Sequence, residues 1–169
     1  MMVKFSLKVR LNFSFMIKLY FIILYLFLFS NANTESYVKA GENLIWDSEN
    51  KSYTANGDVE FKNDKFVAYA DKMIAIYEEE NNDEIFTVIE LFDNVVIEFK
   101  EETFKGNYAI YTRNNNIIKL TGDVSIESPT RLLTGSELIA DINNNKRILN
   151  STNKESLVEV LLENNANKD

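Results

Sequence analysis

The sequence contains no cysteine and no histidine, and it has only one proline and five glycines in 169 residues. The absence of cysteine excludes disulfides and thiol nucleophiles. The absence of histidine as well excludes acid–base chemistry at an imidazole, and zinc sites that rely on either residue. The scarcity of proline and glycine, together with 12% aromatic residues, is typical of an ordered chain. The length predicts one domain of moderate size.

Basic residues are scarce beyond the first 32 positions. Four of the 18 Lys and Arg (Lys4, Lys8, Arg10 and Lys18) precede position 33, and no acid does, so residues 33–169 hold 14 bases against 26 acids, a net charge of −12. A nucleic-acid partner requires a basic surface that neutralises its phosphates. The sequence therefore predicts no nucleic-acid partner.

One long apolar run lies near the amino terminus. Residues 19–29 carry no charge, follow the basic stretch and precede Ser30-Asn31-Ala32, the small-x-small pattern that signal peptidase cleaves. This 11-residue run is short for a bilayer span, which needs about 20 residues. We therefore expect residues 1–32 to form a signal peptide that is cleaved after Ala32. Two alternatives stay open: residues 11–29 form an uncleaved anchor, or translation starts at Met16 and leaves a more compact signal peptide.

The rest of the chain contains a threefold repeat. Each unit starts with a tripeptide, which we call the first landmark, and a dipeptide that we call the second landmark begins 13 residues later. The pairs are Gly57-Asp58-Val59 with Ala70-Asp71, Asp93-Asn94-Val95 with Gly106-Asn107, and Gly122-Asp123-Val124 with Gly135-Ser136. A seven-residue insertion near residues 78–84 lengthens one hairpin. Residues 49–51, 114–116 and 143–145 predict tight turns, because the asparagine in them tolerates a left-handed backbone.

Apolar side chains alternate within each unit. They fall two and four residues after the start of the first landmark, and three and five residues after the start of the second. Such alternation indicates half-buried strands, because successive side chains leave opposite faces. A half-unit that starts at the second-landmark position Gly41 opens the domain, and Phe99 extends the middle unit by one further alternate position. The candidate positions for one continuous inner face are Leu44, Trp46, Val59, Phe61, Met73, Ala75, Val95, Ile97, Phe99, Tyr111, Val124, Ile126, Leu138 and Ala140.

These patterns predict an all-β chain of about ten to twelve short strands. Residues 33–150 form the repeat domain, and residues 151–169 form a carboxy-terminal tail or a final strand. Within that tail, residues 155–163 also fit a helical turn. Short asparagine-rich turns favour antiparallel hairpins over a parallel solenoid. We therefore predict an open antiparallel β-roll built from repeated two-strand units.

Candidate catalytic and metal-binding residues are few. Asp71 and Asp141 are conceivable as an acid pair, but carboxylates more commonly lie on solvated faces and in turns. The acidic run at residues 78–84 lacks the ordered spacing and the glycine of a calcium loop. Neither a glycine-rich phosphate loop nor a Gly-x-Ser-x-Gly motif occurs. The sequence therefore predicts no enzymatic activity, no metal and no cofactor.

The inner face has two interpretations on periodicity alone. The simpler one is a packed core, which is the default for any apolar set of period two. The other is a groove of uniform width for acyl chains, which a roll of near-identical units would provide.

The repeat resembles that of a known family. The segments that carry the resemblance are Ala55-Asn56-Gly57-Asp58-Val59, Ala68-Tyr69-Ala70-Asp71-Lys72, Lys105-Gly106-Asn107-Tyr108-Ala109-Ile110-Tyr111, Leu120-Thr121-Gly122-Asp123-Val124 and Leu133-Thr134-Gly135-Ser136-Glu137-Leu138. They resemble the OstA-like repeat of the LptA family of periplasmic lipopolysaccharide-transport proteins, over about residues 40–149. The middle unit departs from the family pattern, because Asp93-Asn94-Val95 lacks the glycine.

The resemblance implies a V-shaped antiparallel β-jellyroll in the periplasm. Its hydrophobic interior would shield the acyl chains of lipid A, so that the fourteen inner-face positions line the lipid-binding groove. Protomers of that family join head to tail and bridge an LptC-like inner-membrane protein to an LptD-like outer-membrane protein. Because the exported part is acidic, we expect the protein to hold the acyl chains and to leave the polar head in solvent.

Four alternatives remain at this stage. The same domain with an uncleaved anchor would resemble LptC, and a detached copy would resemble the amino-terminal domain of LptD. A structural β-roll with a dry core has the same strand pattern. An exported hydrolase would use Asp71 and Asp141.

Overall fold

The computed structural model describes residues 36–151 and 157–162. The predictions of a signal peptide, of cleavage after Ala32 and of an anchor lie outside the described residues. In the described part, no helix has the length and apolar character needed to cross a membrane.

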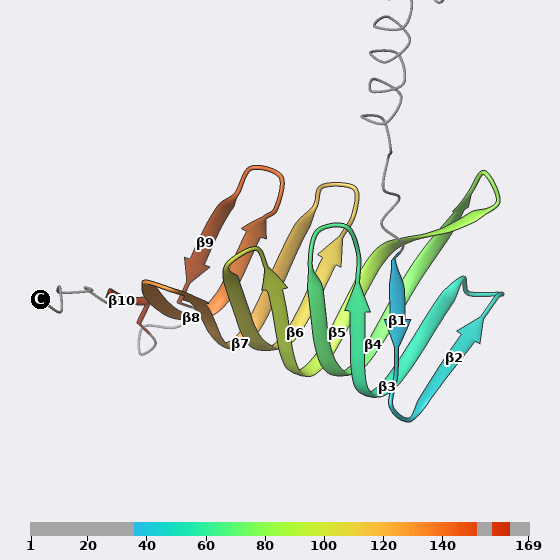
Figure 1. Cartoon of the computed structure of the whole chain (residues 1–169), viewed down its shortest axis with the longest axis horizontal. Coiled ribbons are helices and arrows are strands. Elements are labelled where there is room, and N and C mark those ends of the chain that lie inside the picture. Colours follow the sequence, from blue (N-terminus) through green and yellow to red (C-terminus); the bar gives the residue numbers. More distant parts are fainter. Residues whose placement is uncertain (1–35, 152–156, 163–169) are drawn as a thin grey trace, which may run out of the picture. The chain divides into compact units, whose positions relative to one another are not determined.

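The described part of the chain forms ten strands, which pair in antiparallel fashion, mostly with their neighbours in the sequence (Figure 1). They are β1 (Tyr37–Lys39), β2 (Asn43–Asp47), β3 (Ser52–Lys62), β4 (Val67–Glu80), β5 (Asp83–Phe99), β6 (Glu102–Thr112), β7 (Ile117–Ser128), β8 (Arg131–Asp141), β9 (Lys146–Asn150) and β10 (Glu159–Leu162). Within residues 36–151 and 157–162, the sheet does not close on itself. Among these residues, β1 and β2 at one end each pair only with β3, and β9 and β10 at the other end each pair only with β8.

The predicted number of about ten to twelve strands agrees with the ten in the described residues. The expectation that they are short was wrong for six of them, which are 11 to 17 residues long. The strands β3, β5 and β7 each run through a first landmark instead of ending there. In β3 the pairing register with β4 shifts between Asn56 and Val59, and Gly57 and Asp58 both have positive φ angles of 74° and 42°. Two consecutive left-handed residues make a β-bulge, which bends a strand without ending it.

The same bulge recurs in the other two units. Gly122 and Asp123 have φ angles of 84° and 50°, and Asp93 and Asn94 have φ angles of 60° and 49°. The middle unit therefore bends like the others although it lacks the glycine. Asparagine and aspartate are the residues other than glycine that most readily adopt this conformation.

The bends divide the sheet into two layers of eight segments each, joined along one long side. Layer one consists of β2, residues 52–56, 72–80, 83–92, 108–112, 117–121 and 137–141, and β9. Layer two consists of β1, residues 59–62, 67–70, 95–99, 102–106, 124–128 and 131–135, and β10. We call the other long side, where both layers end in turns and loops, the open side.

Small residues at the second landmarks allow the layers to pack closely at the bends. A Cβ atom on Gly106 would lie 2.9 Å from the Leu120 side chain on the next strand, and one on Gly135 would lie 2.8 Å from the Leu149 side chain. Both separations are shorter than real Cβ contacts. At Gly106 and Gly135, a leucine of the neighbouring strand therefore occupies the space that a side chain would need.

The insertion near residues 78–84 lengthens the hairpin of β4 and β5. Its turn consists of Asn81 and Asn82, with φ angles of 55° and 70°, which matches the two-residue turn favoured between twisted strands. Tyr53 Oη donates a 2.6 Å hydrogen bond to Glu84 and ties the hairpin to β3. No group of acidic residues in the described part of the chain is arranged to hold a metal ion.

Candidate functional site: the apolar interior

The structure buries twelve of the fourteen predicted inner-face positions. Each of them is at most 5% exposed: Val59, Phe61, Met73, Ala75, Val95, Ile97, Phe99, Tyr111, Val124, Ile126, Leu138 and Ala140. They belong to one hydrophobic cluster with members in both layers. Residues directly opposite each other on antiparallel strands share a face, so pairs such as Phe61 with Ala68 continue the inner face from strand to strand.

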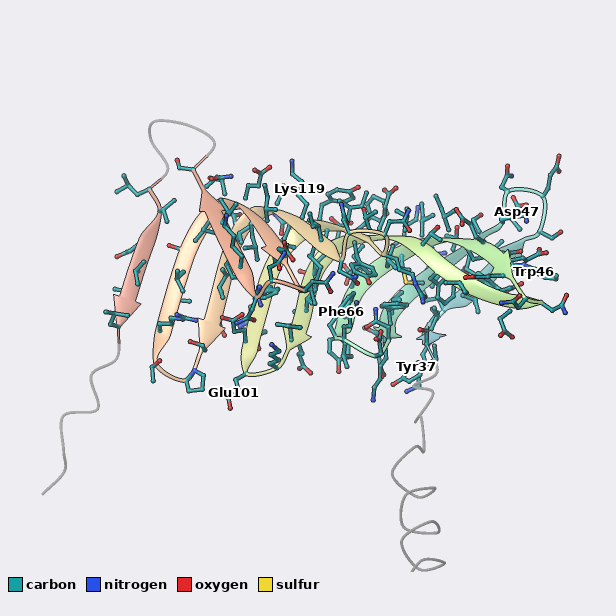
Figure 2. All side chains as sticks on the ribbon, turned by 90° about the horizontal axis from the view of Figure 1, so that it is seen from above. Tyr37, Trp46, Asp47, Phe66, Glu101 and Lys119 are labelled. Carbon is teal, nitrogen blue, oxygen red and sulfur yellow. The ribbon has the colours of Figure 1, made fainter. Side chains whose placement is uncertain are left out.

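Leu44 and Trp46 are the two predicted positions that the structure leaves exposed, at 50% and 60%. They pair with Ala55 and Tyr53, which lie on the inner face, so their exposure results from their place on the edge strand β2. Trp46 Nε1 donates a 3.0 Å hydrogen bond to Tyr77 Oη. The apolar inner face therefore continues into solvent at this end, where Figure 2 labels Trp46.

Sequence reasoning missed several large residues of the interior. Ile89, Leu91, Phe104, Ile118 and Leu120 are all at most 1% exposed. Each stands at every second position of its strand, so the alternation that located the other positions would have located these too. These residues were missed because only positions at fixed distances after the landmarks were selected.

Phe66 had no such signal, because it lies in the loop between β3 and β4. Asn63 Oδ1 accepts hydrogen bonds from the backbone N–H groups of Lys65 and Phe66, at 2.8 Å and 2.9 Å, and so holds the loop in a tight turn. This turn directs the Phe66 side chain, which is 3% exposed, between the layers, where its ring contacts those of Phe61 and Tyr111. Beside it, Lys65 Nζ donates to Asn116 Oδ1 on the turn between β6 and β7.

Tyr111 is the polar member of the predicted set. Its Oη donates a 2.8 Å hydrogen bond to Asn116 Oδ1 at the open side. Burial raises the pKa of Tyr111, with a further rise from the charge of Asp64 and an opposing effect from Arg113. The ring therefore stays uncharged at physiological pH, as an apolar interior requires.

The two layers pack directly against each other. Phe61 of layer two contacts Phe86 of layer one, with ring centroids 6.0 Å apart, and most large interior side chains are less than 2% exposed. A pocket of about 240 Å³ lies at the open side, where Phe61 and Tyr111 meet the charged side chains of Lys65 and Arg113. The described interior is thus a filled core with a polar rim along its open side.

The aspartates of the hydrolase alternative have structural partners. Asp71 accepts a 2.8 Å hydrogen bond from Asn94 at the bend of β5. Asp141 accepts hydrogen bonds from the backbone N–H and the side-chain amide of Asn144, at 3.0 Å and 2.8 Å, and so caps the turn after β8. These bonds lower the pKa of Asp141, the side-chain bond from Asn144 most of all. Such contacts belong to bends and turns and give no sign of an acid pair.

The fold and the site together define an open antiparallel β-jellyroll built around a continuous apolar interior. Among the described residues, each layer has an unpaired strand edge at both ends. Residues 37–146 match the family model described as "LptA/(LptD N-terminal domain) LPS transport protein". The chain belongs to this family of lipopolysaccharide-transport proteins, as the repeat predicted. The family is described as one of transport proteins.

A solved structure supports the fold. The crystal structure of LptH from Pseudomonas aeruginosa, described as the LptA-homologous periplasmic component of the lipopolysaccharide transport device, is similar with a TM-score of 0.67. The match covers 80% of this chain and 99% of LptH at 12% identity, so it shows the fold alone. A comparison with curated proteins found no significant match.

Proposed function

We propose that this protein is a periplasmic component of lipopolysaccharide transport that buries the acyl chains of lipid A between its two layers. The observation that carries the proposal is the apolar inner face, which continues across the roll in a member of a lipopolysaccharide-transport family. Burial of acyl chains supplies about 0.8 kcal/mol per methylene before losses.

The packed interior means that the layers separate when acyl chains bind. The bulges at the first landmarks are the natural hinge, because they already join the layers through left-handed residues such as Gly57 and Gly122. Acyl chains then replace side-chain contacts between the layers, so one apolar contact is exchanged for another. The competing interpretation, a structural β-roll with a dry core, requires the layers to stay together.

Exposed apolar strands at both ends support association with further β-sheets. Leu44, Ile45 and Trp46 of β2 are all at least 50% exposed, and so are Val160 and Leu161 of β10 at the other end. Strands at an open edge carry unpaired backbone groups that recruit further strands. We propose head-to-tail self-association through these edges, with an LptC-like inner-membrane protein at one end of the bridge and an LptD-like outer-membrane protein at the other.

A membrane-anchored, LptC-like component is the second candidate, and it depends on residues outside the described part. Cell fractionation with a tag at the carboxy terminus distinguishes the two. A cleaved protein in the periplasmic fraction supports the transport bridge, whereas the intact amino terminus in membranes supports the anchored component.

Site-specific photo-crosslinking tests the main proposal. A photoreactive residue at Phe61 or Ile97 lies on the inner face, and the same residue at the exposed Glu98 on the outer face of β5 is the matched control. With lipopolysaccharide, we expect adducts at Phe61 and Ile97 and none at Glu98. A folded protein that forms no adduct at either inner position would establish the dry core instead.

A further inference from the structure

Three charged residues join the two layers at the open side near β9. We call Glu102, Arg131 and Arg147 the Glu102 cluster. Glu102 begins β6 in layer two, Arg131 begins β8 in layer two, and Arg147 lies on β9 in layer one. Arg147 Nε donates a 3.0 Å hydrogen bond to Glu102 Oε2, and Arg131 Nη2 lies 3.0 Å from Glu102 Oε1. The cluster therefore connects the layers through one carboxylate.

Arg147 belongs to the border of the apolar interior. It pairs with Ala140, a buried inner-face residue, and its side chain is only 13% exposed. Its guanidinium lies 5.0 Å from the ring centroid of Phe99 and 5.1 Å from that of Phe104. Arg147 is thus a cation that packs on two aromatic rings of the interior. It lies at the position where the polar head group of a lipid would join acyl chains that occupy the interior.

The Glu102 carboxylate does not provide an aligned acceptor for every arginine nitrogen of the cluster. Arg147 Nη2 is buried and lies 2.9 Å from Glu102 Oε2, the oxygen already bonded to Nε, and it makes no aligned hydrogen bond within the described residues. Three donor nitrogens thus share two oxygens. A phosphate monoester offers three oxygens, one for each donor, and arginine pairs with phosphate in the same forked geometry as with carboxylate.

The structure has room for such a group beside the cluster. A pocket of about 520 Å³ is lined by Glu102 and Arg131 together with Lys100, Asn145 and a second carboxylate, that of Glu101. Lys100 Nζ lies 4.9 Å from the ring centroid of Phe99, on which Arg147 also packs, and adds a third cation to this corner of the molecule. These cations gather at one corner of a chain that is acidic overall.

We propose that Arg131 and Arg147 form a binding site for the phosphate group of an acylated amphiphile, which Glu102 occupies as an internal substitute. The acyl chains lie between the layers, and the phosphate displaces the Glu102 carboxylate toward the adjoining pocket. The inference rests on the proposed lipid-binding function. On net charge alone, we expect the protein to leave the polar head group in solvent. With this site, the protein instead holds the head group at a local cluster of cations.

Binding measurements on the purified protein test this site with three probes: lipid A that carries both phosphates, the same lipid A after dephosphorylation, and inorganic phosphate. Glu102→Gln removes the competing charge, so we expect several-fold tighter binding of phosphorylated lipid A and unchanged binding of the dephosphorylated form. Glu98→Gln, on the outer face of the preceding strand, is the matched control and should change neither. Arg131→Gln should abolish the preference for the phosphorylated form.

The outcomes separate this inference from the proposed function. If the wild type and all variants bind both lipids equally, the phosphate site is overturned while acyl-chain binding stands. If folded wild-type protein binds neither lipid, the proposed function itself fails. Displacement of phosphorylated lipid A by equimolar inorganic phosphate would indicate a site for free anions and overturn the assignment to a lipid. Thermal unfolding verifies that each variant is folded. If Glu102→Gln does not fold, Arg131→Gln still tests the site, because the Arg131 side chain is half-exposed and its replacement disturbs the core less.

Discussion

The ring of Phe66 packs edge-on against the ring of Tyr111, with 4.9 Å between the ring centroids and 80° between the planes. The two residues come from opposite layers, since Phe66 lies in the loop after β3 and Tyr111 lies near the end of β6. Beside them, Lys65 bonds to Asn116 across the same gap. This contact closes the open side near the middle of the roll, as the Glu102 cluster does near β9.

Phe66→Ala should destabilise the protein by about 3 kcal/mol, the usual cost of removing a buried phenylalanine. The lost ring leaves a cavity between the layers at the point where they are held together. Denaturant unfolding measures the loss. Tyr69→Ala, two strand positions into β4 and 38% exposed, is the control and should cost less.

The same variant tests whether the layers separate to admit acyl chains. With the contact to Tyr111 removed, a fluorescent fatty acyl probe should enter the interior faster than in the wild type. An unchanged rate, despite the expected loss of stability, would show that Phe66 is only a core residue.

Gly122→Ala should destabilise the protein by about 1–2 kcal/mol, because its left-handed backbone disfavours any residue with a Cβ atom. The φ angle of Gly122 is 84°, and the added Cβ atom would lie 2.8 Å from Asn107 Cβ. The free energy of unfolding in urea measures the effect. Asp93→Gly, at the corresponding bulge of the middle unit, is the counterpart. It should change stability by less than about 1 kcal/mol, since relief of strain opposes the added freedom of the unfolded chain. Equal losses in the two variants would contradict the bulge assignment.

Asp141 makes the stability depend on pH. Hydrogen bonds from Asn144 hold the pKa of Asp141 below its ordinary value, so its carboxylate stabilises the fold at pH values above the unfolded-state pKa of about 4. That stabilisation is lost as the pH falls through the lowered pKa of the folded state. Asp141→Asn should therefore lower the thermal unfolding midpoint at neutral pH and make little difference in strong acid.

A pH series of thermal unfolding curves for Asp141→Asn and wild type measures this dependence. Glu101→Gln, in the exposed turn between β5 and β6, is the control for loss of one surface charge. A destabilisation by Asp141→Asn that is the same at every pH would assign the effect to altered turn geometry and not to the ionised carboxylate.

Trp46 reports on the β2 edge, because it is the single tryptophan of the chain and 60% exposed. If β2 of one protomer meets the β9 and β10 end of another, its fluorescence should shift to shorter wavelength and its acrylamide quenching should fall as protein concentration rises. Leu161→Lys places a charge on β10 and should abolish both changes. Asn114→Lys, in the turn between β6 and β7, should leave them intact. Association seen by sedimentation without any change at Trp46 would place the interface elsewhere.

The sequence by itself determined the repeat, the antiparallel hairpins and most of the inner face. Residues such as Val59, Phe61, Val95 and Ile97 alternate with polar neighbours, and a period of two has one structural meaning wherever one face is buried. The asparagine-rich turns, such as residues 143–145, likewise encode their own left-handed backbone. These are local properties, so a single chain reveals them.

Only the tertiary structure decided how the strands bend and how the interior closes. A Gly-Asp pair such as Gly57-Asp58 fits the end of a strand as well as a bulge within one, and only the pairing on both sides of it separates the two. Phe66 and Tyr111, or Glu102 and Arg147, lie 45 residues apart in the sequence. Their contacts depend on the stacking of two layers, and side-chain alternation is the same whether those layers touch or stand apart.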